Sequence, residues 1–291
     1  MGIYDSILVV GGYGMLAGAF KRALNQRKLN ATYIDRDVCD ITDPSQVAKW
    51  FDQVKPTLVL NCAAYTAVDR AEQEEPIATA INGAAIGTLA RESRKHNAML
   101  VHYSTDYVFD GTITRPLRPD DPVGPQSAYG RSKLAGEQLL QQNAPQKWLI
   151  IRTAWLYGLG GPSFPKAILD AARAGKPLNV VDDQTGSPTF TDDLAKATLE
   201  LIDRDAKGIW HLVNDGAVTW HDFADAILKQ FNVNAPLSRT TSAEWKKSRP
   251  SSAVRPTYSV LDITPFQRLT GHRTRHWSEA LKDFQSMCQG A

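Results

Sequence analysis

Residues 7–14 read ILVVGGYG, so four apolar residues run directly into a glycine-rich turn. A short, wholly apolar run that ends in glycine is typical of a strand buried on both faces of a parallel sheet. An amphipathic stretch from Met15 to about Lys28 predicts the helix that follows. Gly11 and Gly14 let the backbone approach a pyrophosphate, and the start of the helix offers unpaired N–H groups. This strand–turn–helix unit therefore predicts a dinucleotide site.

Strand and helix patterns continue to alternate along the first half of the chain. Further apolar strands are predicted at residues 32–35, 58–61, 99–104 and 149–153. Helices are predicted from Asp43-Pro44 onward, at about 76–96, and at 129–142. Such alternation requires a parallel sheet with helices on both faces. The predicted fold class is α/β, a doubly wound parallel sheet of Rossmann type.

After Thr153 the pattern loosens, with isolated helices between loops rich in glycine and proline. We predict a dinucleotide-binding domain at residues 1–155, with returning segments near 189–213 that include a strand at 209–212. Residues 156–188 and 214–291 would form a smaller, discontinuous substrate lobe. The polar stretch 238–256 is predicted to be a long loop, and loops of that length are usually functional.

The composition excludes several classes of protein. The chain has 291 residues, of which 43% are hydrophobic and 22% charged, with a net charge of +2, so it is neither disordered nor a polyphosphate binder. No apolar run has the length of a membrane span. Its three cysteines lie far apart, which argues against a disulfide framework and a zinc site. We expect a cytoplasmic protein without a nucleic-acid or membrane partner.

The acidic and basic residues after the second strand bear on the choice of cofactor. Asp35 lies about 20 residues beyond the glycine turn, where an acid binds the adenosine ribose and favours NADH. Arg36 follows and could instead pair with the 2′-phosphate of NADPH, so both cofactors stay open. Asp43 is the natural cap of the next helix, which leaves Asp40 freer to contact adenine.

One group of residues carries the predicted chemistry. Tyr129 and Lys133 are four residues apart, hence on one face of a helix. Tyr129 would donate a proton to the alkoxide formed by ketone reduction, while Lys133 would lower the pKa of Tyr129 and bind the nicotinamide ribose. Thr105, at a strand end, would orient the substrate carbonyl. Asn82 would either hold a water in a relay to Lys133 or bond a neighbouring backbone.

These residues resemble the extended short-chain dehydrogenase/reductase family, and within it the dTDP-4-dehydrorhamnose reductases. The resemblance runs over nearly the whole chain. It rests on the segments 61–69, 71–72, 103–109, 129–137, 152–155, 183–189 and 255–256, together with Ser259.

The resemblance implies reduction of the C4 ketone of dTDP-4-dehydro-6-deoxy-L-mannose to dTDP-L-rhamnose by NADPH or NADH. It implies catalysis by Thr105, Tyr129 and Lys133. Substrate contacts would come from Thr105, Asp106, Trp155 and Arg255, the last meeting the phosphates of the dTDP-sugar. Implied cofactor contacts, besides Tyr129 and Lys133, are Gly14, Met15, Leu16, Asp35, Asp40, Ile41, Ala64, Tyr65 and Thr66.

The chain departs from the family pattern at the acidic residues that bind magnesium in bridged dimers. The position on the first helix carries Ala19, and the later position carries Asp192. We therefore predict no metal site, with Mg²⁺ doubtful as a cofactor. A monomer and a homodimer both stay open.

Three other functions are compatible with this resemblance. Dehydratases of the same fold carry Asp-Glu after the active-site threonine, whereas Tyr107 follows Asp106 here, which favours a reductase. A non-catalytic subunit like the regulatory subunit of methionine adenosyltransferase is a second alternative, because fold does not determine function. A related nucleotide-deoxysugar 4-ketoreductase, acting on another sugar or with another C4 stereochemistry, is the third.

Overall fold

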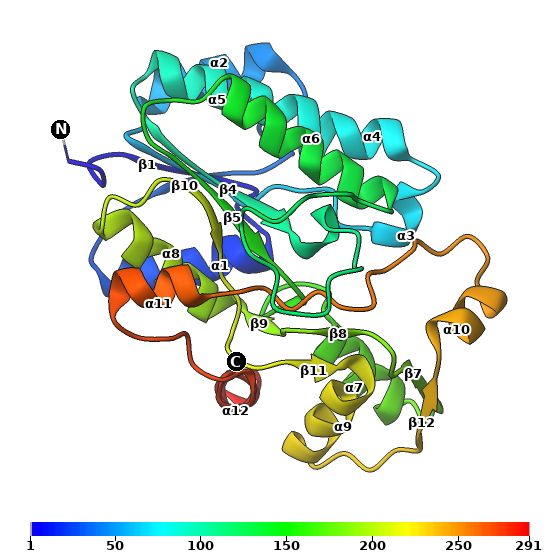
Figure 1. Cartoon of the computed structure of the whole chain (residues 1–291). Coiled ribbons are helices and arrows are strands. Elements are labelled where there is room, and N and C mark those ends of the chain that lie inside the picture. The colour runs from blue at the N-terminus through cyan, green and yellow to red at the C-terminus, as the bar shows by residue number, and fades with distance from the viewer. Residues whose placement is uncertain (1, 291) are drawn as a thin grey trace.

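The computed structural model describes residues 2–290 and is built around a six-stranded parallel sheet (Figure 1). The strand order is β10-β5-β4-β3-β1-β2, so the chain reverses its direction of growth across the sheet between β1 and β3. The doubly wound α/β prediction is confirmed. The strands are β1 (Ile7–Val10), β2 (Thr32–Ile34), β3 (Leu58–Asn61), β4 (Met99–Thr105), β5 (Trp148–Thr153) and β10 (Gly208–His211).

Helices cover both faces of this sheet (Figure 1). On one face lie α1 (Met15–Gln26) and α8 (Thr191–Asp203); on the other lie α2 (Pro44–Val54), α5 (Ala85–Lys95) and α6 (Ala128–Gln142). Residues of β1 alternate between the two resulting cores, which explains why that strand has no polar position. None of the helices within residues 2–290 is both long and apolar enough to cross a bilayer.

The helix predicted at 76–96 is interrupted. It consists of α4 (Glu75–Thr79), the π-helical turn η1 (Ala80–Ala84) and α5, and is preceded by α3 (Val68–Ala71). Asn82 lies inside the π-helical turn, where its amide accepts from Tyr65 N and donates to Tyr65 O and the Ser132 hydroxyl. Asn82 therefore bonds a neighbouring backbone, the second of its two predicted roles. Such turns widen a helix locally and are frequent near functional sites.

The rest of the chain forms short strand pairs and helices. Most of them surround an aromatic core, whereas the helix Thr264–Thr270 buries Phe266 in the core that contains α1 and α8. The parallel pairs are β6 (Leu156–Tyr157) with β9 (Thr189–Phe190) and β7 (Leu178–Val181) with β12 (Leu237–Thr240), and β8 (Thr185–Gly186) is antiparallel to β11 (Val218–Thr219). The helices are α7 (Phe164–Arg173), α9 (Trp220–Gln230), α10 (Ser242–Ser248), α11 (Thr264–Thr270) and α12 (Trp277–Gln289). The division into two domains stays a prediction.

The prediction of a long loop at 238–256 is wrong for its first half. This stretch contains the end of β12 and all of α10. Thr241 and Glu244 form a reciprocal capping box at the start of α10, which stabilises a helix that has no buried residues. The sequence reading missed it because a short polar helix shows no apolar periodicity.

Candidate active site

The glycine turn lies at the carboxyl end of β1, where the sheet reverses its order. Gly11 has φ = +77°, and a Cβ there would lie 2.6 Å from the backbone N of Ala63. Only glycine fits between β1 and the loop after β3. Met15 begins α1, and no side chain caps that helix, so its first N–H groups remain free for an anion. Leu16, the next residue, is buried in the core.

Asp35 lies beside the glycine turn at the end of β2. Its carboxylate accepts hydrogen bonds from Tyr13 N (2.9 Å) and from Arg36 N (2.7 Å). The Arg36 side chain is exposed at the same edge. The acid expected to favour NADH and the base expected to favour NADPH thus lie side by side.

The turn before α2 confirms one prediction and corrects another. Asp43 caps α2 as predicted, by accepting from Ser45 N and Gln46 N. Asp40 is only partly free, because one of its oxygens accepts from Thr42 N (2.9 Å) and the Thr42 hydroxyl (2.7 Å). Its contact with adenine stays a prediction. These bonds lower the pKa of Asp40. Aspartate commonly bonds the backbone two residues ahead, and this local competition was overlooked. Ile41 is buried.

The loop after β3 passes next to Gly11. Within it, Ala64 and Thr66 are exposed. Tyr65 is held by its backbone bonds to Asn82 and by a hydroxyl bond to Glu74 (2.7 Å). The structure therefore brings residues 64–66 to the edge of the sheet that carries the glycine turn.

Thr105, Tyr129 and Lys133 also converge at this edge. Thr105 is the last residue of β4, and Tyr129 lies in the first turn of α6, whose cap Ser127 accepts from Gly130 N. The Thr105 hydroxyl lies close enough to the Tyr129 phenol to oppose the rise in the pKa of Tyr129. Lys133 is 2% exposed and donates from Nζ to the backbone carbonyl of Tyr103 (2.5 Å).

The pKa values at this site differ from the prediction. Burial, with a further contribution from the Asp106 carboxylate, raises the pKa of Tyr129 to about 12, and the nearby Thr105 hydroxyl only partly opposes this rise. Lys133 does not lower the pKa of Tyr129 as predicted. Its ammonium group instead donates to the Tyr103 carbonyl. Burial lowers the pKa of Lys133 itself to about 8, against the attraction of Glu137. Tyr129 is thus protonated near neutral pH, as a proton donor must be.

Asp106 is a buried acid in direct contact with Thr105. Its side chain is 1% exposed and accepts a hydrogen bond from the Thr105 hydroxyl (2.9 Å). Burial raises the pKa of Asp106 to about 6, although the hydroxyls of Ser259 and Thr105 favour the ionised form. Near neutral pH the Asp106 carboxylate holds the Thr105 proton, while the Thr105 oxygen accepts a hydrogen bond from Tyr107 N (3.2 Å), so both partners fix the orientation of the hydroxyl.

We predict a pH-dependent effect of Asp106→Asn on stability. The pKa of Asp106 rises from an ordinary 3.8 to about 6 on folding. Its protonation therefore stabilises the fold fully below about pH 4, and this stabilisation is lost as the pH rises through 6. The asparagine variant does not titrate, so its stability relative to wild type should increase by up to about 3 kcal/mol between about pH 4 and about pH 8. Urea unfolding across this range measures the difference, with the exposed Asp37→Asn as control; a constant difference contradicts the prediction.

Trp155 lies two residues beyond the end of β5, whose Thr153 is paired with Thr105. It is therefore close to the catalytic edge of the sheet. Its φ is +47°, a left-handed conformation that is a genuine outlier for a bulky residue. The Trp155 indole stacks on Trp220, with ring centroids 3.5 Å apart and planes 9° apart.

Arg255 lies near the same edge and is held by an acid that the sequence reading missed. Its guanidinium is 2.9 Å from Asp69, whose carboxylate also accepts from Ala253 N. Asp69 belongs to the segment 61–69 that carries the family resemblance, but no local pattern pairs it with so distant a residue. The structure thus brings Arg255 back over the loop after β3.

The two positions of the family's magnesium site have other roles here. Ala19 is fully buried in the core. Both carboxylate oxygens of Asp192 accept hydrogen bonds from Arg22, at 2.8 and 2.6 Å. An arginine therefore already neutralises the one acid that this chain keeps.

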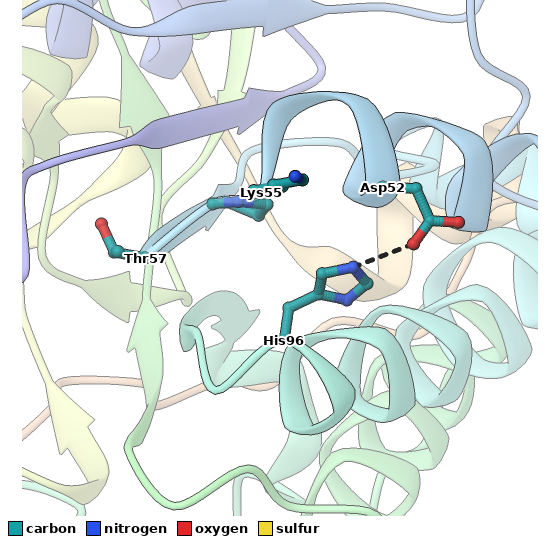
Figure 2. A pocket seen from close by; sticks show the side chains of 5 residues that line it. Asp52, Lys55, Thr57 and His96 are labelled. Atoms are coloured by element: carbon teal, nitrogen blue, oxygen red, sulfur yellow. Dashed lines mark hydrogen bonds and ion pairs between the residues drawn. The ribbon is translucent and has the colours of Figure 1, made fainter. Parts of the chain in front are cut away.

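Figure 2 shows a hollow at the opposite edge of the sheet, lined by Asp52, Lys55, Pro56, Thr57 and His96. Thr57 immediately precedes β3, and His96 follows α5, so the hollow lies at the amino ends of the strands. His96 Nε2 is 3.1 Å from Asp52 Oδ1. Because ligands of open parallel sheets bind at the carboxyl ends, the catalytic candidates lie elsewhere.

A doubly wound sheet with a glycine turn after β1, and with a threonine, a tyrosine and a lysine at the ends of β4 and α6, defines the short-chain dehydrogenase/reductase class. The model of the family described as RmlD substrate binding domain matches residues 5–289. The chain belongs to this family.

Curated relatives and solved structures resemble the chain over almost its full length. A dTDP-4-dehydrorhamnose reductase of Streptomyces griseus is 39% identical, over 97% of this chain and 93% of its own. A dTDP-4-keto-6-deoxy-D-glucose reductase of Streptomyces niveus is 36% identical, over 95% of each chain. The crystal structure of a dTDP-4-dehydrorhamnose reductase from Bacillus anthracis, in complex with NADP, is 32% identical with a TM-score of 0.91, over 97% of this chain and 99% of its own.

Proposed function

We propose that the protein is an NAD(P)H-dependent dTDP-4-dehydrorhamnose reductase, which reduces the C4 ketone of dTDP-4-dehydro-6-deoxy-L-mannose to dTDP-L-rhamnose. The single observation that carries this proposal is the convergence of Thr105, Tyr129 and Lys133 on the sheet edge that bears the glycine turn. Membership of a family with reductases among its relatives supports the same substrate class.

Each residue of this group has a distinct role in the proposed reaction. The bound nicotinamide supplies the hydride. Tyr129 would give its phenolic proton to the alkoxide oxygen at C4, Thr105 would orient that oxygen, and Lys133 would bind the nicotinamide ribose. The glycine turn and the free N–H groups of α1 would bind the pyrophosphate, with Asp35 and Arg36 at the ribose. No step requires a metal.

The test is to incubate the purified protein with dTDP-4-dehydro-6-deoxy-L-mannose and NADPH or NADH, and to identify the product. Oxidation of the cofactor with formation of dTDP-L-rhamnose supports the proposal. The opposite configuration at C4, or turnover of other keto sugars only, points to a related 4-ketoreductase like the Streptomyces niveus relative. No turnover, together with co-purification of an adenosyltransferase, points to a regulatory subunit.

We propose that Arg255 binds the diphosphate of the substrate, and predict that Arg255→Ala raises the KM for the sugar nucleotide. The α1 terminus is reserved for the cofactor, so the substrate needs a second cationic site. A charge-assisted arginine–phosphate bond is worth about 1.5–3 kcal/mol, which corresponds to a rise in KM of roughly 10- to 150-fold. Steady-state kinetics at saturating NADPH measure this effect.

Arg249→Ala is the matched control for Arg255→Ala, because Arg249 is exposed and stacks on Trp245 in the same segment. It should leave the KM unchanged. An Arg255→Ala variant with wild-type KM, or with equally weakened NADPH binding, would remove Arg255 from the substrate site. A cytosolic location and a monomeric or homodimeric state stay predictions.

A further inference from the structure

The strained backbone of Trp155 is explained by two residues that hold its indole from outside β5. Strands β8 and β11 pair antiparallel, with Gly186 opposite Val218. Trp220 follows directly after β11. This two-stranded sheet therefore places a glycine and a tryptophan next to the same indole ring.

Gly186 lies against one face of the Trp155 ring. A Cβ on Gly186 would lie 2.6 Å from Cε2, 2.7 Å from Cζ2 and 2.8 Å from Nε1 of Trp155. These three atoms are consecutive in the ring and the middle one is nearest, so the Cβ would lie above the ring plane. Only glycine leaves room there for the indole.

Trp220 covers the opposite face. The two indole rings are nearly parallel, with centroids 3.5 Å apart, so a Cβ above Trp155 on that side would lie nearer to Trp220 than to Trp155. The atoms nearest to the Gly186 Cβ all belong to Trp155, which places Gly186 and Trp220 on opposite faces. Phe164 supports Trp220 from behind, with centroids 4.4 Å apart.

Covered on both faces, the Trp155 indole can meet a ligand only with its edge. That edge carries the Nε1–H donor, and the Trp155 side chain is only partly buried. An N–H donor at a fixed angle suits a sugar hydroxyl, whereas an open face would suit the apolar face of a sugar ring.

We propose that Trp220 and Gly186 are positioning residues, which clamp Trp155 so that its edge, and not its face, contacts the sugar. This proposal rests on the proposed function, since it takes Trp155 to be a substrate contact. The clamp also stabilises the left-handed backbone at Trp155, because such strain persists only where the surroundings hold it. Specificity for the sugar would thus depend on a residue that does not touch it.

Trp220→Leu and Trp220→Phe test the clamp. Leucine keeps an apolar side chain against Phe164 but lacks a flat face, whereas phenylalanine keeps a flat face. Trp220→Leu should raise the KM for the sugar nucleotide about threefold to tenfold, while kcat and the Kd for NADPH stay nearly unchanged. In Trp220→Phe this KM should stay close to the wild-type value. The circular-dichroism signal of two stacked indoles should disappear in both variants. Gly186→Ala, which forces the ring aside, should raise KM independently.

The outcomes separate the two proposals when binding of dTDP-L-rhamnose with NADP⁺ is titrated alongside turnover. Weaker binding of dTDP-L-rhamnose by Trp220→Leu supports the clamp even if the wild type shows no turnover. The absence of turnover would contradict only the proposed function. Wild-type KM and binding in Trp220→Leu, with the stacked-indole signal lost, overturns the clamp alone. A wild-type protein that neither turns over the substrate nor binds the product overturns both.

Discussion

Replacing Tyr129 with phenylalanine should lower kcat by about 10²–10⁴-fold, because the reaction loses its general acid. The pKa of Tyr129 is raised to about 12, so the phenol is protonated throughout the neutral range. Phenylalanine keeps the edge-to-face packing on Tyr107, with centroids 5.6 Å apart, and removes only the hydroxyl. The fold and the NADPH site should therefore survive.

Single-turnover kinetics with enzyme and NADPH in excess measure this loss at the chemical step, and fluorescence titration measures NADPH binding. Tyr103→Phe is the matched control, since it removes another buried hydroxyl, bonded to Thr198 on the opposite face of β4. That variant should keep kcat within a fewfold of wild type. A Tyr129→Phe enzyme with near wild-type kcat would exclude Tyr129 as the proton donor.

Replacing Glu137 with alanine should lower the free energy of unfolding by about 3–5 kcal/mol. Glu137 lies one turn after Lys133 on α6 and accepts both hydrogen bonds of a bidentate pair from Arg152, at 2.9 and 2.7 Å. The exposures of the two side chains are 0% and 3%. Removal of the carboxylate leaves a buried guanidinium whose one other hydrogen bond within residues 2–290 goes to the Pro119 carbonyl.

Chemical denaturation measures this effect, and a second ion pair that involves the same helix serves as the control. Arg131 of α6 makes an equally bidentate pair with Glu75, but at the surface. Glu75→Ala should cost no more than about 1 kcal/mol, because exposed ion pairs are screened by water. If both variants lose the same free energy of unfolding, burial does not determine how much the Glu137–Arg152 pair stabilises the fold.

The sequence by itself was enough for the order of elements and the core of the candidate site. Neighbouring residues determine the apolar strand β1, the glycine turn after it and the helix α1. They also determine the Asp43 cap and the one-turn spacing of Tyr129 and Lys133. These features depend on local periodicity and local hydrogen bonding, which a reading along the chain can detect.

Short-range competition between hydrogen bonds was harder to read. The sequence at Asp40 allows a free carboxylate and a closed turn equally, and the structure closes the turn on Thr42. The sequence around Asn82 likewise predicted a continuous helix. In the structure the Asn82 amide instead bonds the backbone N–H and carbonyl of Tyr65, and the helix has a π-helical turn there. In both cases one side chain had several possible partners.

Only the tertiary structure decided which distant residues meet at the catalytic edge. Asp69 meets Arg255, Glu137 meets Arg152, and Trp155 is enclosed by Gly186 and Trp220. Each contact joins different elements, so it depends on strand order, register and the path of loops across the sheet. The pKa values of Tyr129, Lys133 and Asp106 follow from the same packing, because burial is their largest cause. Burial arises from the whole fold, and no run of adjacent residues encodes it.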